Sequence, residues 1–99
     1  MTARQIGFHP AAIEEALAAA RWYRVRSRRA AESFVTEITQ ALDRIADGPQ
    51  RWPADPTGTR KVRLPCFPFR IIYRETSETI QILAVAHAKR RPGYWSDRL

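Results

Sequence analysis

The sequence lacks a long apolar run, a second cysteine and an apolar segment behind its N-terminus. No run of about 18 apolar residues occurs, which argues against a membrane-spanning helix. Cys66 is the only cysteine, so it cannot form an internal disulfide, and a lone thiol fits a reducing cytoplasm. Residues 1–5 lead into no signal-peptide core. We therefore expect a cytoplasmic protein outside the membrane, with Cys66 as a packed or idle thiol.

Metal ligands are equally scarce. His9, His87 and Cys66 lie far apart in the chain and do not form a ligand cluster, so we expect neither a metal site nor a cofactor. The hydrophobic fraction of 44% is ordinary for a globular chain and argues against disorder. A length of 99 residues suits one domain with one core, and we expect residues 1–99 to form it.

Positive charge is abundant and unevenly distributed. The net charge is +7 and the isoelectric point about 10.7. Residues 60–99 contain nine Lys/Arg against three Asp/Glu, whereas residues 1–59 contain eight against seven. A solvated basic face would explain the total, but it explains this segregation less well. The second half of the chain therefore indicates a polyanion or an acidic protein as a partner.

The second half also has the pattern of a β-sheet. In residues 69–74, apolar and basic side chains alternate with the period of a strand. Residues 79–87 are almost continuously apolar, which is typical of a central strand covered on both faces. The polar residues 75–78 suit a hairpin loop between the two. Alternation in residues 61–64 predicts a third strand, and the short run 6–8 predicts an edge strand.

The first half predicts two helices. Pro10 suits a first helical turn, and the helix should reach about Arg26. Ser27 is a plausible N-cap for a second helix, which Gly48 should end. With almost no connector, the two helices must form an antiparallel hairpin that buries its apolar side on the sheet. His9 is assigned no role. The apolar stripe of the first helix is expected to be Ile13, Ala16, Leu17, Ala20 and Tyr23.

The sequence thus predicts an α+β fold: an N-terminal strand, an antiparallel helical hairpin and a three-stranded antiparallel sheet, with the N-terminal strand added at the edge. The expected core consists of Leu17, Phe34, Ile38, Leu42, Ile45, Val62, Leu64, Phe69, Ile71, Leu83 and Val85.

Eight short segments along nearly the whole chain form a recognisable series: residues 8–10, 22–23, 31–34, 52–53, 58–60, 69–74, 84–87 and 91–95. In their order and spacing they resemble the RelE/ParE superfamily of toxins from bacterial type II toxin–antitoxin modules. The resemblance implies a small growth-arresting toxin that is neutralised by a cognate antitoxin in a hetero-oligomer. Because the basic half is so charged, we expect an acidic, partly disordered antitoxin segment that folds on binding.

The superfamily divides by target. RelE-like members cleave mRNA in the ribosomal A site, whereas ParE-like members inhibit DNA gyrase without being nucleases. The ribonuclease branch uses basic residues and a tyrosine, and the matching places here hold Lys61, Arg63, Arg70, Arg90 and Tyr94. The resemblance therefore implies mRNA cleavage first, with gyrase inhibition as the alternative. The long, nearly loop-free helical hairpin is more similar to ParE-like members. A nucleic-acid-binding module without toxicity is a third, weaker alternative.

Metal-free RNA cleavage requires charge stabilisation and proton transfer. The arginines would stabilise the phosphorane, and His87, where some members place a histidine, would titrate near neutrality. Lys61 could act as a base if the arginines lowered its pKa, and Tyr94 could stack on a nucleobase. The expected catalytic residues are Lys61, Arg63, Arg70, His87, Arg90 and Tyr94, with Arg74, Lys89 and Arg91 binding substrate.

Structural roles compete with these assignments. A hydrogen-bonded structural His87 is as plausible as a catalytic one. Arg70 and Arg74 could pair with Glu75 and Glu78, although exposed ion pairs contribute little. Tyr94 could join Trp95 in a lid over the helical hairpin, and for Trp95 the lid is the preferred interpretation. Trp22 and Tyr23 are expected to be core residues or antitoxin contacts.

Overall fold

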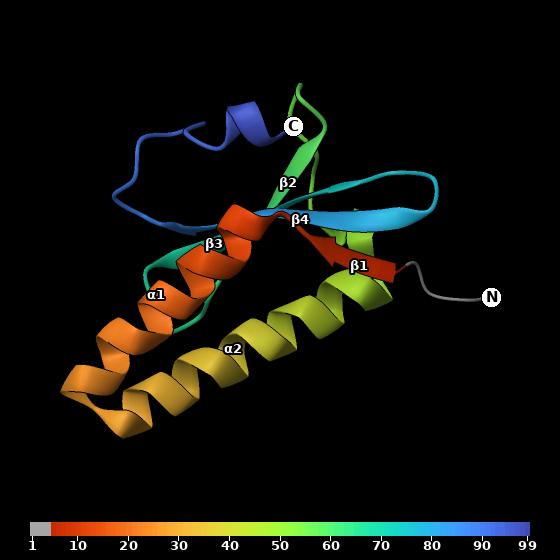
Figure 1. The fold of residues 1–99 in the computed structure, drawn as a ribbon. Coiled ribbons are helices and arrows are strands. Elements are labelled where there is room, and N and C mark those ends of the chain that lie inside the picture. The colour runs from red at the N-terminus through yellow and green to blue at the C-terminus, as the bar shows by residue number, and fades with distance from the viewer. Residues whose placement is uncertain (1–4) are drawn as a thin grey trace.

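One sheet divides the molecule into two layers (Figure 1). The computed structural model describes residues 5–99, in which four strands form a sheet in the order β1–β4–β3–β2. β1 pairs in parallel with β4, and the other two pairings are antiparallel. The predicted α+β fold is confirmed, with the N-terminal strand at the sheet edge. The strands are β1 (Gln5–Phe8), β2 (Thr59–Arg63), β3 (Phe69–Glu75) and β4 (Thr79–His87).

Two helices cover one face of this sheet. They are α1 (Pro10–Arg26) and α2 (Arg28–Asp47), which fold back on each other as predicted. The Ser27 hydroxyl accepts a hydrogen bond from the amide of Ala30 at 3.1 Å and caps α2. His9 has a role that the sequence analysis did not assign, because its Nδ1 accepts from the Ala11 amide at 3.1 Å and caps α1. None of the helices within residues 5–99 is both long enough and apolar enough to cross a membrane.

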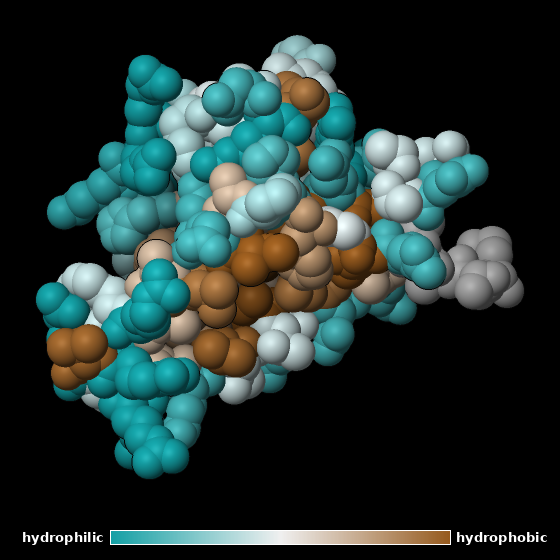
Figure 2. Space-filling model, viewed as in Figure 1, coloured by the Kyte–Doolittle hydropathy of each residue, from teal (hydrophilic) through white to brown (hydrophobic). Residues whose placement is uncertain are grey.

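The predicted apolar stripe of α1 is wrong for its two largest aliphatic residues. Ile13 and Leu17 are 45% and 48% exposed, whereas Ala12 and Ala19 are buried. Alanine lets the helix approach β4 and α2 closely, so the larger side chains lie at the margin of the contact. They line an apolar groove together with residues of α2 and the sheet. Figure 2 shows an apolar patch at the centre of the face that it presents. The rest of the predicted helix-side core is buried or packs against it.

The C-terminal segment, residues 88–99, covers part of the opposite face of the sheet. Trp95 is 5% exposed and packs on Ile72, Leu83 and Ala86. The register shifts between Ile72 and Tyr73 of β3, whose partners are Ala84 and Ile82, so Leu83 is the extra residue of a bulge. Trp95 is therefore a lid, but the expectation that it lies over the helical hairpin is wrong: the sheet separates the two.

Candidate functional site

Three of the predicted cations extend from one face of the sheet. Arg63 on β2 pairs directly with Arg70 on β3, and Lys61 pairs with Ile72. Ile72 belongs to the cluster around Trp95, so these cations lie on the face away from the helices. The Nζ atom of Lys61 is 6.0 Å from the centroid of the Trp95 ring. The predicted phases of β2 and β3 are confirmed, whereas the bulge in β4 places Leu83 on the face of Trp95, opposite the face of Val85.

A small hollow gathers most of the predicted catalytic residues. Its volume is about 60 Å³, and its cations come from β2, β3 and the segment after β4. Arg63 is absent from it and instead lines, with Arg70 and the loop 64–68, a neighbouring hollow of about 620 Å³. The predicted site residues that line the small hollow are Lys61, Arg70, His87, Arg90, Arg91 and Tyr94.

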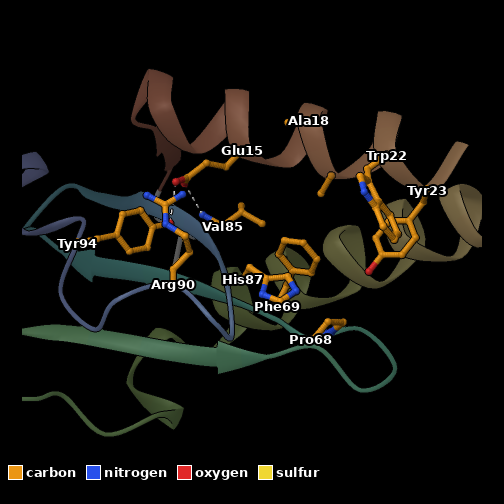
Figure 3. A pocket seen from close by; sticks show the side chains of 11 residues that line it. Glu15, Ala18, Trp22, Tyr23, Pro68, Phe69, Val85, His87, Arg90 and Tyr94 are labelled. Carbon is orange, nitrogen blue, oxygen red and sulfur yellow. Dashed lines mark hydrogen bonds between the residues drawn. The ribbon is translucent and has the colours of Figure 1, made fainter. Parts of the chain in front are cut away.

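A larger groove runs between α1 and the end of β4 (Figure 3). It has a volume of about 590 Å³ and is rich in aromatic side chains. His87, Arg90 and Tyr94 line this groove as well as the small hollow, so they lie between the two. The lining residues are Glu15, Ala18, Ala19, Trp22, Tyr23, Pro68, Phe69, Val85, His87, Arg90 and Tyr94.

His87 has structural contacts at the end of β4. Its ring meets Phe69 edge-on, with the ring centroids 5.0 Å apart. Its Nδ1 atom accepts a hydrogen bond from the amide of Lys89 at 3.0 Å, which fixes the turn after the strand. Phe69 in turn packs against Phe34 of α2, so the imidazole is oriented by the helix-side core.

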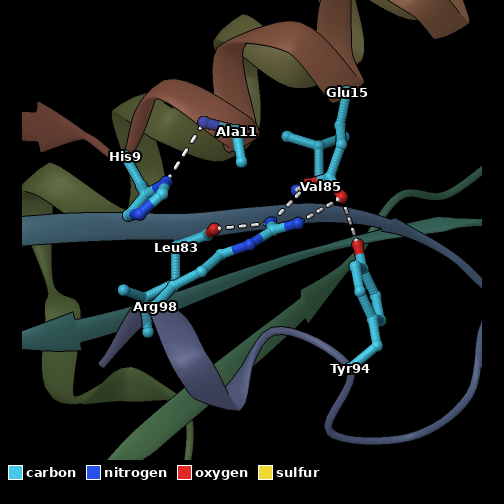
Figure 4. A network of polar contacts seen from close by, with 7 residues as sticks. All are labelled: His9, Ala11, Glu15, Leu83, Val85, Tyr94 and Arg98. Atoms are coloured by element: carbon cyan, nitrogen blue, oxygen red, sulfur yellow. Dashed lines mark hydrogen bonds and ion pairs between the residues drawn. The ribbon is translucent and has the colours of Figure 1, made fainter.

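Tyr94 is tied to a carboxylate that the sequence analysis did not identify. Its hydroxyl donates to Glu15 Oε2 at 2.7 Å (Figure 4). Burial, together with this hydrogen bond to Glu15, raises the pKa of Tyr94 to about 12. The same carboxylate accepts two hydrogen bonds from the Arg98 guanidinium, at 2.9 and 3.0 Å, and one from the Val85 amide at 3.0 Å.

Glu15 ionises readily in this network. Burial opposes its charge, but the hydrogen bonds from Arg98, Tyr94 and Val85 outweigh burial and lower the pKa of Glu15 below 4.5. No local sequence signal connects α1 with the last residues of the chain, so only the folded structure reveals this contact.

The remaining predicted residues lie in the turn after β4 and on β3. Arg90 stacks on Tyr94, with its guanidinium carbon 3.9 Å from the ring centroid. Lys89 and Arg91 are exposed in the turn after β4. The Nε of Arg74 donates to Gln81 at 2.9 Å, and Arg74 lines none of the three hollows described above.

The competing interpretation paired Arg70 and Arg74 with Glu75 and Glu78. Glu75 forms an ion pair with Arg60 at 3.3 Å. Within residues 5–99, no three side chains of His, Cys, Asp or Glu come together as ligands for a metal ion.

Comparison with known proteins identifies one family. Residues 6–92 match the family model described as the ParE toxin of the type II toxin–antitoxin system parDE. The fold is similar to a solved chain from the chromosomal ParDE toxin–antitoxin system of P. aeruginosa, with a TM-score of 0.74 and 20% identity. That similarity covers 85% of this chain and 95% of the other. A search of curated proteins finds no match.

Proposed function

The chain belongs to the ParE toxin family of type II toxin–antitoxin systems, and from this premise we propose that it arrests growth by binding DNA gyrase and not by cleaving mRNA. The sequence alone favoured mRNA cleavage. The geometry of the candidate site favours the alternative for two reasons.

The first reason is the small size of the hollow in which five of the six predicted catalytic residues meet. The hollow where the cations meet His87 has only about 60 Å³, whereas pockets for small ligands have roughly 300–1,000 Å³. Arg63 and Arg70 line one larger hollow, and His87, Arg90 and Tyr94 line the other. The small volume of the hollow that five of the six residues share is the observation that carries the proposal.

The second reason is that the groups suited to proton transfer have structural contacts. An efficient acid or base has a pKa near the working pH, and the pKa of Tyr94 is about 12. The Nδ1 atom of His87 accepts from the backbone, and its ring is packed on Phe69. Fixed cations without such groups can still bind an acidic protein surface, where complementary charge increases the association rate and specificity.

The antitoxin is the second partner that this function requires. We propose that its apolar residues cover a groove of about 320 Å³ lined only by apolar side chains of β1, the two helices and the sheet. Phe8, Ile13 and Leu17 border it and are 43%, 45% and 48% exposed. An acidic segment that continued from this groove would neutralise the basic residues of the sheet half.

The test is brief induction of the toxin in bacterial cells, with DNA, RNA and protein synthesis followed separately. We expect DNA-damage signalling and filamentation before translation falls, and inhibition of supercoiling by purified gyrase. The double variant Arg70→Ala, Arg90→Ala should lose both effects, whereas Arg44→Ala, which removes an exposed charge elsewhere on α2, should keep them. Early failure of translation with newly cut transcripts would overturn the gyrase proposal and restore mRNA cleavage.

A further inference from the structure

The tip of the helical hairpin has a concentration of arginine that the proposed function does not use. Five of the nine residues from 21 to 29 are arginines, all of them exposed, and no acidic residue occurs between Glu15 and Glu32. We call these five the tip arginines: Arg21, Arg24, Arg26, Arg28 and Arg29. Most of the side chains at this end of the hairpin, at the lower left of Figure 2, are hydrophilic.

The tip arginines occupy electrostatically unfavourable positions in the fold. Arg28 and Arg29 occupy the first turn of α2, where the helix dipole favours negative charge. They also follow Arg24 and Arg26 of the last turn of α1 after a single intervening residue. Only Arg28 has an ion-pair partner within residues 5–99, Glu32 at 3.4 Å, and that pair is exposed. An external anion would relieve this repulsion.

The tip arginines adjoin the aromatic groove between α1 and β4. The guanidinium carbon of Arg26 lies 3.6 Å from the centroid of Trp22, which lines one end of the groove. Arg90 stacks in the same way on Tyr94, which lines the other end at 3.9 Å. Figure 3 shows these two aromatic residues at opposite ends, with His87 and Phe69 between them. The groove therefore has an arginine on an aromatic ring at each end.

The lining of the groove suits flat, weakly polar groups. Its carboxylate, Glu15, is already paired with Arg98, so it contributes little repulsion to an anion. Trp22 remains 53% exposed although Arg26 lies over its ring. From Glu15 to Trp22 the groove follows α1 for about 10 Å, given a helical rise of 1.5 Å per residue.

We propose that the groove and the tip arginines bind single-stranded nucleic acid, with bases against Trp22 and the other rings and phosphates at the arginines. Cationic tracks combined with aromatic stacking surfaces are the usual means of binding single strands without sequence preference. A guanidinium group can donate two parallel hydrogen bonds to the oxygens of one phosphate. All the basic residues between 21 and 29 are arginines, and none is a lysine. The half-exposed Trp22 favours a base over an acidic peptide, because every base has a face on which an aromatic ring stacks.

The first test is binding of an oligothymidylate of about a dozen nucleotides to the purified chain, followed by tryptophan fluorescence and by anisotropy of a label on the oligonucleotide. We expect the oligonucleotide to quench the fluorescence and Trp22→Phe to abolish most of the quenching, because Trp95 is buried on the other face of the sheet and Trp52 does not line the groove. Trp22→Ala should weaken binding roughly 5- to 150-fold, the usual effect of losing one stacking ring. Unchanged quenching in Trp22→Phe would overturn the proposal.

The second test separates a tip site from general positive charge. Arg21→Gln with Arg29→Gln should lower the slope of log affinity against log salt by about 1.4, because each phosphate contact on a single strand contributes about 0.7. Arg44→Gln with Arg51→Gln removes the same charge elsewhere and should leave the slope unchanged. Equal losses in both double variants would overturn the proposal. Tighter, Trp22-dependent binding of polyglutamate than of the oligonucleotide would also overturn it and identify an acidic peptide instead.

These outcomes are independent of the toxin's target. Binding of an oligonucleotide is measured without gyrase or ribosomes, so the proposed function and this inference can fail separately.

Discussion

Glu15 and Arg98, 83 residues apart in the chain, form a two-point ion pair in which Nη1 lies 2.9 Å from Oε1 and Nη2 lies 3.0 Å from Oε2. Both side chains are largely buried, at 17% and 14% exposed. The pair lies where β1 has ended and β4 continues without a neighbouring strand on that side. There, Glu15 accepts from the Val85 amide, and Arg98 donates to the Leu83 carbonyl at 3.0 Å. The side chains of Glu15 and Arg98 thus form hydrogen bonds with this edge of β4, which a longer β1 would have covered.

Glu15→Gln should lower the free energy of unfolding by about 2–3 kcal/mol. The substitution removes the charge that accepts from Arg98, and hydrogen bonds to charged groups contribute roughly 1.5–3 kcal/mol. Glu14→Gln is the matched control, since Glu14 is exposed in the same turn of α1 and should change stability by less than about 0.5 kcal/mol. Urea denaturation measures both. Equal stability of the two variants would show that the network contributes nothing.

Tyr94→Phe tests whether the Tyr94 hydroxyl contributes to stability or acts directly in toxicity. Losing the hydroxyl leaves one oxygen of Glu15 with a hydrogen bond fewer, so stability should fall by about 1–2 kcal/mol. The ring that stacks on Arg90 is retained, so growth arrest should be retained when the variant is induced without antitoxin. Complete loss of toxicity in a variant that is still folded by circular dichroism would assign the hydroxyl a direct role.

Arg70→Ala should weaken gyrase binding roughly 30-fold, the effect of losing an interface contact of about 2 kcal/mol. Its place opposite Arg63 makes it part of the most concentrated positive charge on the sheet face. Surface plasmon resonance against the immobilised gyrase complex would measure the change, with Arg44→Ala as the control. Because charge complementarity acts on encounter, part of the loss should appear in the association rate and should shrink at high salt.

Leu17→Asp should disrupt antitoxin binding without unfolding the toxin. Leu17 is 48% exposed and borders the apolar groove, so a charge there is tolerated in the free chain but would be buried under a partner. Val35→Asp is the control, because Val35 is also 48% exposed but does not line the groove. Co-purification with the antitoxin and rescue of growth measure the effect. Equal loss with Val35→Asp would place the antitoxin elsewhere.

Asp55 should make stability depend on pH in the acid range. Hydrogen bonds from Thr57 and Thr59, that of the Thr57 side chain foremost, hold the pKa of Asp55 at about 2, below its ordinary 3.8. Because the folded pKa is the lower one, the stabilisation is complete above about 3.8 and is lost as pH falls toward 2. Asp55→Asn should therefore reduce stability at neutral pH and flatten the pH profile between 4 and 2. Thermal unfolding at several pH values tests this, with the exposed Asp43→Asn on α2 expected to leave the profile unchanged.

The predictions that held from sequence rest on short-range physics. Alternation in residues 69–74 determined which side chains of β3 share a face, and the register of Arg70 opposite Arg63 agrees with it. Ser27 and Gly48 marked helix ends because capping groups act within one turn. These features need no knowledge of distant partners.

The sequence by itself thus determined the order of elements, the helix ends, the strand phases and the concentration of positive charge in the second half. Tertiary structure alone decided which side of α1 is buried, because the alanines at 12 and 19 allow close packing that hydropathy counts cannot anticipate. It also decided the sheet face that Trp95 covers and the pairing of Glu15 with Arg98 and Tyr94. Such contacts join residues far apart in sequence, and their geometry is set by the packing of whole elements, which no local pattern encodes.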